Sequence, residues 1–217
     1  IQVRTSALDI RDTTFDNNTS TVDGGTLFCF DCSGVMENVT VTGGSGGGLT
    51  FVGAGEVELK HLTIVGTGGG SGWESPFGAA LHVYDDMDVS ITNSVLANNY
   101  SIGDAVNCAV SEDASLVSLG NNAFGDLTGC NVTPLASDLL IDSAELEPLA
   151  AGRDGLPVRL PSADSPLVDA FDDASCLTAD ARGITRPRDG DEDGQPRCDI
   201  GAAERRANTI FRDRFRF

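Results

Sequence analysis

The chain has 217 residues, of which 33 are acidic and 14 basic, and its formal net charge is −19. This length suits one domain, and a hydrophobic content of 40% allows a buried core, so wholesale disorder is excluded. The negative charge argues against binding to nucleic acid or to anionic membranes. The sequence predicts no membrane span. It predicts no signal peptide either, so we expect Ile1 to be a mature or trimmed start.

A short pattern recurs along the first 125 residues. It reads apolar, any residue, apolar, four residues, apolar, and then small or amide residues; Gly34 stands in the first apolar place of its second copy. The copies span residues 8–18, 34–44, 57–66, 89–99 and 117–125. The third apolar residues, which we call the anchor residues, are Phe15, Val41, Ile64, Leu96 and Phe124. They are spaced by 26, 23, 32 and 28 residues, a period typical of a solenoid.

A second short segment lies between these copies and is also predicted to form strands. Its four versions begin at Gly25, Gly48, Ala80 and Asn107. The runs are short, rich in β-branched residues and bounded by turn residues, which favours strands over helices. We therefore predict an all-β fold, a right-handed parallel β-helix of about five coils over residues 1–134, with Asn17-Asn18 and Asn98-Asn99 at tight corners. An antiparallel sandwich is the alternative.

One insertion and one acidic run interrupt the repeats. The loop 66–78 contains Trp73, and Tyr84 precedes the cluster Asp85, Asp86 and Asp88. Trp73 and Tyr84 are candidate ligand contacts, for example by stacking on a sugar, although Trp73 could equally cap the coil below it. His61 and His82 lie in neighbouring coils and have no third ligand in view, so we expect ordinary surface histidines.

Six cysteines fall into three pairs along the chain. They are Cys29 and Cys32, Cys108 and Cys130, and Cys176 and Cys198. No histidine lies near any of them, which argues against zinc, and disulfides in an oxidising compartment are the better interpretation. Neighbour pairing is our hypothesis among fifteen possible connectivities.

The last third of the chain differs in charge and in motifs. Residues 1–150 have 20 acids and three bases, a net of −17, whereas residues 151–217 have a net of −2. Three motifs occur in order after Pro148: Ser165-Pro166-Leu167-Val168-Asp169, Asp180-Ala181-Arg182-Gly183-Ile184-Thr185-Arg186-Pro187, and Asp199-Ile200-Gly201-Ala202-Ala203-Glu204. They resemble the C-terminal end of the choice-of-anchor Q family of secreted bacterial β-helix proteins, over residues 145–204. The resemblance implies an extracellular, surface-associated β-helix and no particular reaction.

Residues 135–217 are expected to form an irregular cap on the β-helix. Arg182 and Arg186 flank a glycine, and Asp180, Asp199 and Glu204 are candidate partners for fixed ion pairs. Such pairs would lock this region over the last coil, because an open solenoid end exposes strand edges and core. We expect Cys176 and Cys198 to staple this cap. The N-terminal end, in contrast, is predicted to be open.

The loop 189–195 is the candidate metal site. Asp189, Asp191 and Asp193 alternate before Gly194, which matches the opening of a calcium loop, and the backbone carbonyl of Gln195 could add a ligand. Ile200 stands where an EF-hand has its bidentate glutamate, so this is not a complete EF-hand. The cofactor prediction is Ca²⁺, and a solvated acidic turn is the alternative.

Two classes of function remain open. The first is a non-enzymatic extracellular or cell-surface scaffold, adhesive or self-assembling through its ends, with other copies or neighbouring domains as partners. The second is a carbohydrate-binding or polysaccharide-degrading protein. A lyase acting on a polyanion is disfavoured, because the sequence between Arg11 and Arg153 contains Lys60 as its one basic residue, apart from histidines. A hydrolase needs two carboxylates about 5–10 Å apart, ideally in a groove with an aromatic ring.

Overall fold

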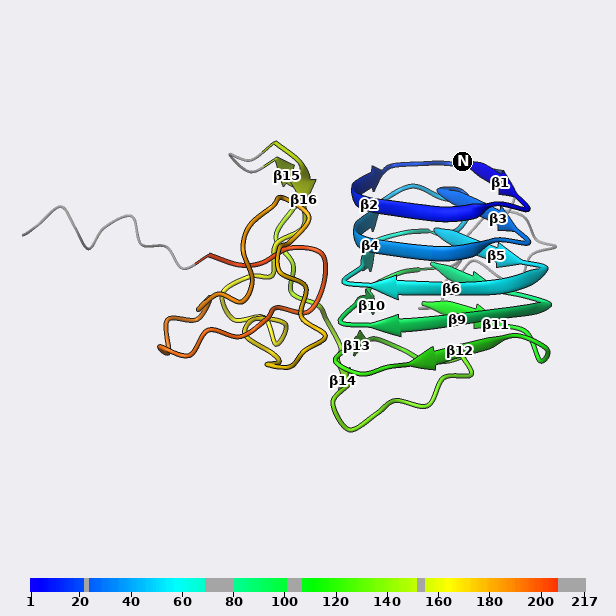
Figure 1. Cartoon of the computed structure of the whole chain (residues 1–217). Coiled ribbons are helices and arrows are strands. Elements are labelled where there is room, and N and C mark those ends of the chain that lie inside the picture. Colours follow the sequence, from blue (N-terminus) through cyan, green and yellow to red (C-terminus); the bar gives the residue numbers. More distant parts are fainter. Residues whose placement is uncertain (22–23, 69–79, 101–106, 152–154, 207–217) are drawn as a thin grey trace, which may run out of the picture.

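The described chain is all-β. The computed structural model describes residues 1–21, 24–68, 80–100, 107–151 and 155–206 (Figure 1). Within these ranges it contains sixteen strands and no helix. Strands that are neighbours in the two large sheets run parallel, which confirms the predicted all-β class with parallel strands and excludes the antiparallel sandwich.

The first sheet consists of the segments that lie between the repeat copies. Its strands, in spatial order, are β1 (Gln2–Arg4), β3 (Leu27–Phe30), β5 (Leu49–Val52), β8 (Leu81–Val83) and β11 (Cys108–Val110). Leu27, Leu49, Leu81 and Cys108 stack in one fully buried column. Thr26 is therefore aligned with Gly48, so the predicted alignment of the segment at Gly25 was wrong by one residue.

The second sheet is formed by the repeat copies. Its nine strands are β2 (Ala7–Asp16), β4 (Ser33–Thr42), β6 (Ala54–Lys60), β7 (Thr63–Val65), β9 (Asp86–Thr92), β10 (Val95–Ala97), β12 (Ser115–Ser118), β13 (Ala123–Phe124) and β14 (Leu139–Leu140). The anchor residues pair in sequence from Phe15 to Phe124, so all four predicted spacings are confirmed. Because β14 pairs with β13, the sheet continues past residue 134.

The chain turns at columns of residues with left-handed backbone. The column that we call the corner column separates β6 from β7 and their equivalents, and its members have φ between 45° and 56°. They are Asp12, Asn38, His61, Asn93 and Asn121. Asn17 and Asn98 are also left-handed, as predicted for corners. Asn and Asp tolerate this conformation because their short polar side chains hydrogen-bond locally.

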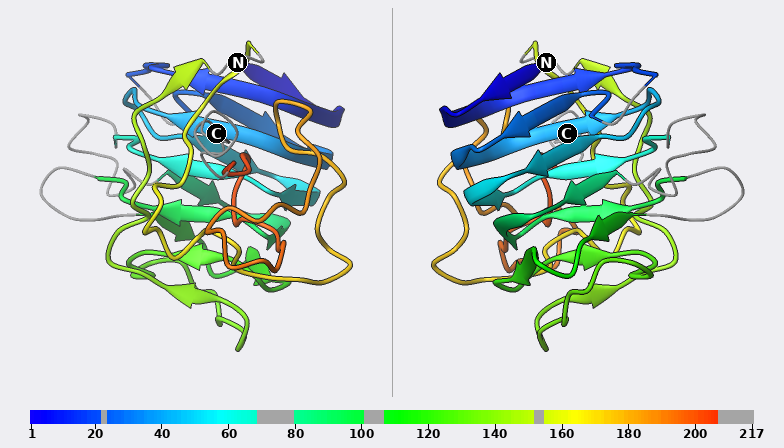
Figure 2. Two further views of the ribbon diagram at one scale, coloured as in Figure 1. Left: turned by 90° about the vertical axis from the view of Figure 1, so that its left-hand side faces the viewer. Right: turned by 90° about the vertical axis from the view of Figure 1, so that its right-hand side faces the viewer.

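Residues 141–206, which we call the C-terminal unit, form an irregular layer against one side of this stack. Their regular elements are the antiparallel pair β15 (Ala150–Ala151) and β16 (Pro157–Val158). Leu167, Phe171 and Ile200 pack with Val65 of β7 and Val95 of β10 in a cluster separate from the core inside the stack. The ribbon of the unit runs alongside this part of the stack (Figures 1 and 2). The unit therefore covers the outer face of β7, β10 and β13, so it lies against the side of the stack and not over the last coil as expected.

The cysteines form three disulfides between neighbours in the sequence. Cys29–Cys32 closes the turn between β3 and β4, Cys108–Cys130 joins β11 to the segment after β13, and Cys176–Cys198 lies within the C-terminal unit. Three disulfides indicate an oxidising compartment.

The two ends of the stack differ. At the β11–β12 end, Leu127, Cys130 and Val132 pack against the core and cover it. At the other end, β2 pairs with β4 alone among the described strands, and Ile10 and Phe15 are half-buried. Their partners in β4, Met36 and Val41, are fully buried. The core is thus closed at one end and incompletely covered at the other.

Candidate functional site

The acidic loop of the C-terminal unit is closed at its base and braced by its own carboxylates. Arg188 and Arg197 exchange backbone hydrogen bonds of 3.3 and 3.2 Å. Within the loop, Asp193 N–H donates to Asp191 Oδ1 at 2.9 Å, and Gly194 N–H donates to Asp189 Oδ2 at 3.0 Å. Asp and Gly favour such turns because the side chain accepts a backbone N–H two residues on and glycine adopts positive φ.

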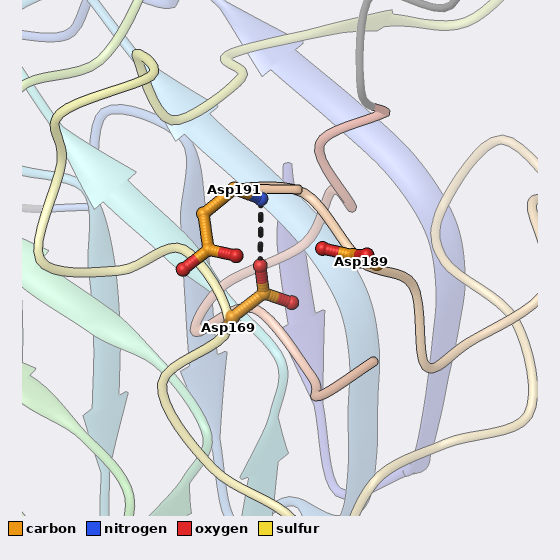
Figure 3. Close-up of side chains that lie close together, drawn as sticks. All are labelled: Asp169, Asp189 and Asp191. Carbon is orange, nitrogen blue, oxygen red and sulfur yellow. Dashed lines mark hydrogen bonds between the residues drawn. The ribbon is translucent and has the colours of Figure 1, made fainter. Parts of the chain in front are cut away.

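Three carboxylates meet at this loop, and one of them comes from outside it. One oxygen from each of Asp169, Asp189 and Asp191 lies within 4.8 Å of the others (Figure 3). Asp169 Oδ2 accepts N–H bonds from Gly190 and Asp191, both at 2.8 Å. Asp189 Oδ1 is a buried oxygen without a hydrogen-bond donor. A hard divalent cation would supply the missing positive charge, since it prefers carboxylate oxygens.

Electrostatics makes this triad receptive to a cation. Burial raises the pKa of Asp169, and the charge of Asp191 raises it further, while N–H bonds from Asp191, Arg197 and Gly190 oppose the shift. Asp169 is 5% exposed. A partly desolvated carboxylate beside a second carboxylate is destabilised in its charged form, and a bound cation would relieve this repulsion.

The triad overlaps only partly with the predicted calcium ligands. Asp189 and Asp191 belong to it, whereas the Asp193 carboxylate lies 3.7 Å from the guanidinium of Arg197, and Gln195 is exposed at the rim of the loop. Sequence reasoning missed Asp169. Its signal is the motif Ser165-Pro166-Leu167-Val168-Asp169, which ends in this carboxylate.

The predicted cap residues form one buried charge network. Arg186 and Glu204 pair at 3.1 Å, and both side chains are fully buried. Arg186 also donates to the carbonyls of Asp199, at 2.9 Å, and Gly201, at 2.7 Å. Arg182 pairs with Asp180 at 2.6 Å. Arg182 also donates to the carbonyl of Glu204, so each arginine joins the segment 180–186 to the segment 199–204.

Asp199 joins this network through the backbone. Its oxygens accept N–H bonds from Asp169 at 2.8 Å and from Arg205 at 2.6 Å. Burial raises the pKa of Asp199 to about 6 and that of Glu204 to about 8. For Glu204 the charge of Arg186 opposes the effect of burial. Because Asp199 holds the backbone of Asp169, the charge network also positions the carboxylate triad.

The corner column anchors the C-terminal unit to the stack. Asn38 Nδ2 donates to Ala179 O at 3.2 Å, Asn93 Nδ2 to Ser175 O at 2.8 Å, and Asn121 Nδ2 to an Asp173 carboxylate oxygen at 2.6 Å. In the other direction, Gly201 N–H donates to Asn93 O at 2.9 Å. Asn38, Asn93 and Asn121 therefore hold the unit against the stack as well as making the turn.

His61 is the third member of this column and is fully buried, so the expectation of an ordinary surface histidine was wrong. Its Nε2 accepts a hydrogen bond from the N–H of Leu177 at 3.3 Å, so the ring proton is on Nδ1. Nδ1 then donates to Gly201 O at 3.2 Å. Burial and the charge of Arg186 lower the pKa of His61 to about 3. The neutral imidazole is thus a structural contact between sheet and unit.

The predicted ligand-contact residues do not form a described site. Trp73 lies outside the described residues. Tyr84 follows β8 and is half-buried, with its ring edge-on to the fully buried His82 at a centroid distance of 5.6 Å.

Carboxylates line several grooves. One, of about 240 Å³, lies on the outer face of β6, β9 and β12, where Glu56 is directly opposite Asp88. A second, of about 410 Å³, has Asp126 and Asp142 in its wall beside Asn98. The described residues that line these two grooves include no aromatic ring. A smaller groove of about 170 Å³ in the C-terminal unit contains Asp172 and Asp173, and its aromatic residue, Phe171, is buried.

In the described part of the chain, no helix has the length and apolar character to cross a membrane. Comparison of the chain with protein-family models, curated proteins and solved structures finds no match.

Proposed function

We propose that residues 1–140 form a right-handed parallel β-helix of about five coils. The in-register parallel pairing of the anchor residues supports this architecture, as does the corner column of left-handed residues. The three motifs after Pro148 support kinship with the choice-of-anchor Q family, and the disulfides favour a secreted or cell-surface location.

The function that this geometry supports best is that of an extracellular structural protein that associates with further copies through its end, without catalysis. The incomplete cover over β2 carries the proposal. Ile10 and Phe15 are half-buried, while the anchor residues of the four following strands are fully buried. A strand edge with partly exposed core residues is a ready template for pairing with another chain.

Light scattering after size-exclusion chromatography tests this function. We expect the apparent mass to rise with protein concentration, because association follows mass action. A single monomeric mass over the whole concentration range would contradict self-association.

We further propose that Asp169, Asp189 and Asp191 bind Ca²⁺ and thereby fasten the loop 189–195. At millimolar calcium and an affinity in the range of extracellular modules, binding would stabilise the fold by about 1–3 kcal/mol. The expected result is a melting temperature that rises by roughly 3–8 °C on exchange of EDTA for Ca²⁺.

The matched control for the calcium proposal lies in the same loop. Asp169→Asn is expected to abolish the calcium response, whereas Asp193→Asn retains it, since Asp193 lies outside the triad and faces Arg197. If Ca²⁺ changes neither the melting temperature nor the calorimetric heat of the unaltered protein, the loop is a solvated acidic turn.

The carbohydrate-directed alternative has less support. The grooves beside Asp88 and Asp126 offer carboxylates for a hydrolase, but the expected aromatic ring is missing among their described lining residues. We therefore place polysaccharide binding behind the structural function.

A further inference from the structure

The open edge of β2 presents its backbone groups in a defined phase. Ser6 O accepts the N–H of Ser33, and β2 pairs with β4 in parallel register. In a parallel ladder, alternate residues of a strand bond to the same neighbour, so the even-numbered residues of this stretch bond to β4. The N–H and C=O groups of Ala7, Asp9 and Arg11 therefore point to the open edge, where no strand of the described chain pairs with them.

The side chains along this edge alternate as well. Asp9 and Arg11 lie on the outer face of the sheet, are exposed and form an ion pair of 2.7 Å. Leu8 and Ile10 face the core. Ile10 is half-buried, whereas its neighbour in β4, Met36, is fully buried. The edge thus combines an acid and a base, two residues apart, with an incompletely covered apolar side chain between them.

These charges make the edge complementary to itself in one register. When two β2 edges meet antiparallel about a two-fold axis through Ile10, Asp9 of each copy lies opposite Arg11 of the other, and both residues direct their backbone groups into the contact. An axis through Asp9 would oppose two aspartates, and an axis through Arg11 two arginines. An axis through Leu8 would place Asp9 opposite the uncharged Ala7. Charge and backbone phase therefore select the axis through Ile10.

We propose that two copies of the chain associate through their β2 edges, antiparallel, with the two-fold axis at Ile10. Each of the two Asp9–Arg11 pairs exchanges two backbone hydrogen bonds. The guanidinium of Arg11 donates to Asp9 and Glu37 of its own copy and has further N–H groups for the partner's Asp9. The two Ile10 side chains cover each other. This inference rests on the proposed self-association and names the surface that mediates it.

The symmetry of this contact predicts a closed dimer. Both copies use the same edge, so one contact satisfies both and leaves no β2 edge for a third copy. At the other end of the stack, Leu127, Cys130 and Val132 already cover the core. The apparent mass should therefore reach a plateau at twice the mass of the chain.

Charge exchange in the full-length protein tests the register. Asp9→Lys brings like positive charges opposite each other, and Arg11→Glu brings like negative charges opposite each other. Because each substitution enters the symmetric contact twice, each variant alone should dimerise about tenfold more weakly in sedimentation analysis. A mixture of the two variants should dimerise about as tightly as the unaltered protein, because every cross-strand pair of the mixed dimer again joins opposite charges.

The matched controls are Glu58→Lys and Lys60→Glu. Glu58 lies in the same column of the sheet as Asp9, and Lys60 in the same column as Arg11, and the two form an ion pair on β6, away from the edge. These variants make the same changes in net charge, so they should leave dimerisation nearly unchanged, alone or mixed.

A cross-link locates the axis directly. Residues paired without backbone hydrogen bonds in an antiparallel ladder have Cα atoms about 4.5 Å apart, which suits a disulfide. Ile10→Cys should therefore yield a covalent dimer under mild oxidation, since all six native cysteines are already paired. Leu8→Cys should not, because its two copies would lie roughly 13 Å apart along the strands.

The outcomes separate this inference from the function on which it rests. A protein that does not associate at all overturns both. Association that tolerates Asp9→Lys and Arg11→Glu overturns the β2 contact alone and places self-association on another surface. Weakening by one of the two variants without recovery in the mixture, or a cross-link through Leu8→Cys in place of Ile10→Cys, overturns the register. Masses that grow beyond the dimer contradict the closed contact.

Discussion

The variant Arg186→Met is expected to lower the free energy of unfolding by about 3–5 kcal/mol, because it leaves one partner of a buried ion pair behind. Arg186 is fully buried, pairs with Glu204 and donates to the carbonyls of Asp199 and Gly201. Methionine fills much of the volume but supplies no donor, so Glu204 and both carbonyls lose a partner. Denaturant titration followed by circular dichroism measures the loss.

A second substitution distinguishes loss of the charge pair from loss of packing. Arg186→Met/Glu204→Leu removes both charges and should recover part of the lost stability, since an apolar pair of similar volume can replace a buried ion pair. If the double variant is no more stable than Arg186→Met, most of the stability lost in Arg186→Met comes from the carbonyl contacts and not from the ion pair. If Arg186→Met lowers the free energy of unfolding by less than about 1 kcal/mol, the charge network does not stabilise the fold.

The same network predicts how stability depends on pH. Because burial raises the pKa of Glu204 to about 8, its contribution is fully present below the ordinary glutamate pKa and is lost as the pH rises through about 8. His61 acts in the opposite sense, since its pKa of about 3 means that its contribution is lost as the pH falls towards 3. Glu204→Gln should therefore flatten the stability profile between about pH 5 and 8 and leave the acid side unchanged.

The stacked sheets were predictable because their determinants are local and repeated. Each anchor residue sits at a fixed place in a short pattern, and parallel stacking converts equal places into one column. The fifth copy is the exception at its first two apolar places, since Leu116 and Ser118, and not Val117 and Leu119, pair with Val89 and Ile91. The strands β1 and β14 were not predicted, because Gln2–Arg4 and Leu139–Leu140 are too short to form a pattern of their own. Their positions are fixed by neighbours already stacked beside them.

The sequence also contains a pattern that marks the corner column. Asp12, Asn38, His61, Asn93 and Asn121 all stand three residues before an anchor residue. Four of them are Asn or Asp, which marks a left-handed corner. His61 was considered as a possible metal ligand or surface residue, so its membership of this column was missed.

The candidate cation site depended on contacts that no local pattern encodes. Asp169 lies twenty residues before Asp189, and irregular chain separates them. Asp169 reaches the loop because Asp199 holds its backbone N–H and because the unit packs on β7 and β10. Sequence could indicate which residue types would pair, but the partners themselves follow from non-local packing.

The second large expected effect concerns Gly34, the residue that breaks the apolar pattern. Gly34 shares a column with Leu8 and Val57, yet its φ of 146° is a conformation that residues with a side chain rarely adopt. A Cβ at this position would lie 1.9 Å from the carbonyl oxygen of Leu8. Gly34→Ala must therefore push β2 away from β4, and we expect it to cost about 3 kcal/mol or more.

The control for Gly34→Ala is Gly183→Ala, where φ is 75° and no atom lies within 4 Å of the added Cβ. That variant carries backbone strain without a collision and should cost about 1 kcal/mol. Hydrogen exchange gives the spatial test, since Gly34→Ala should expose the amides of β2 before those of β9. Because the proposed self-association uses the edge of β2, Gly34→Ala should weaken it, whereas Gly183→Ala should not. Equal losses of unfolding free energy in the two variants would show that β4 tolerates a side chain next to Leu8. They would contradict a steric reason for glycine at position 34.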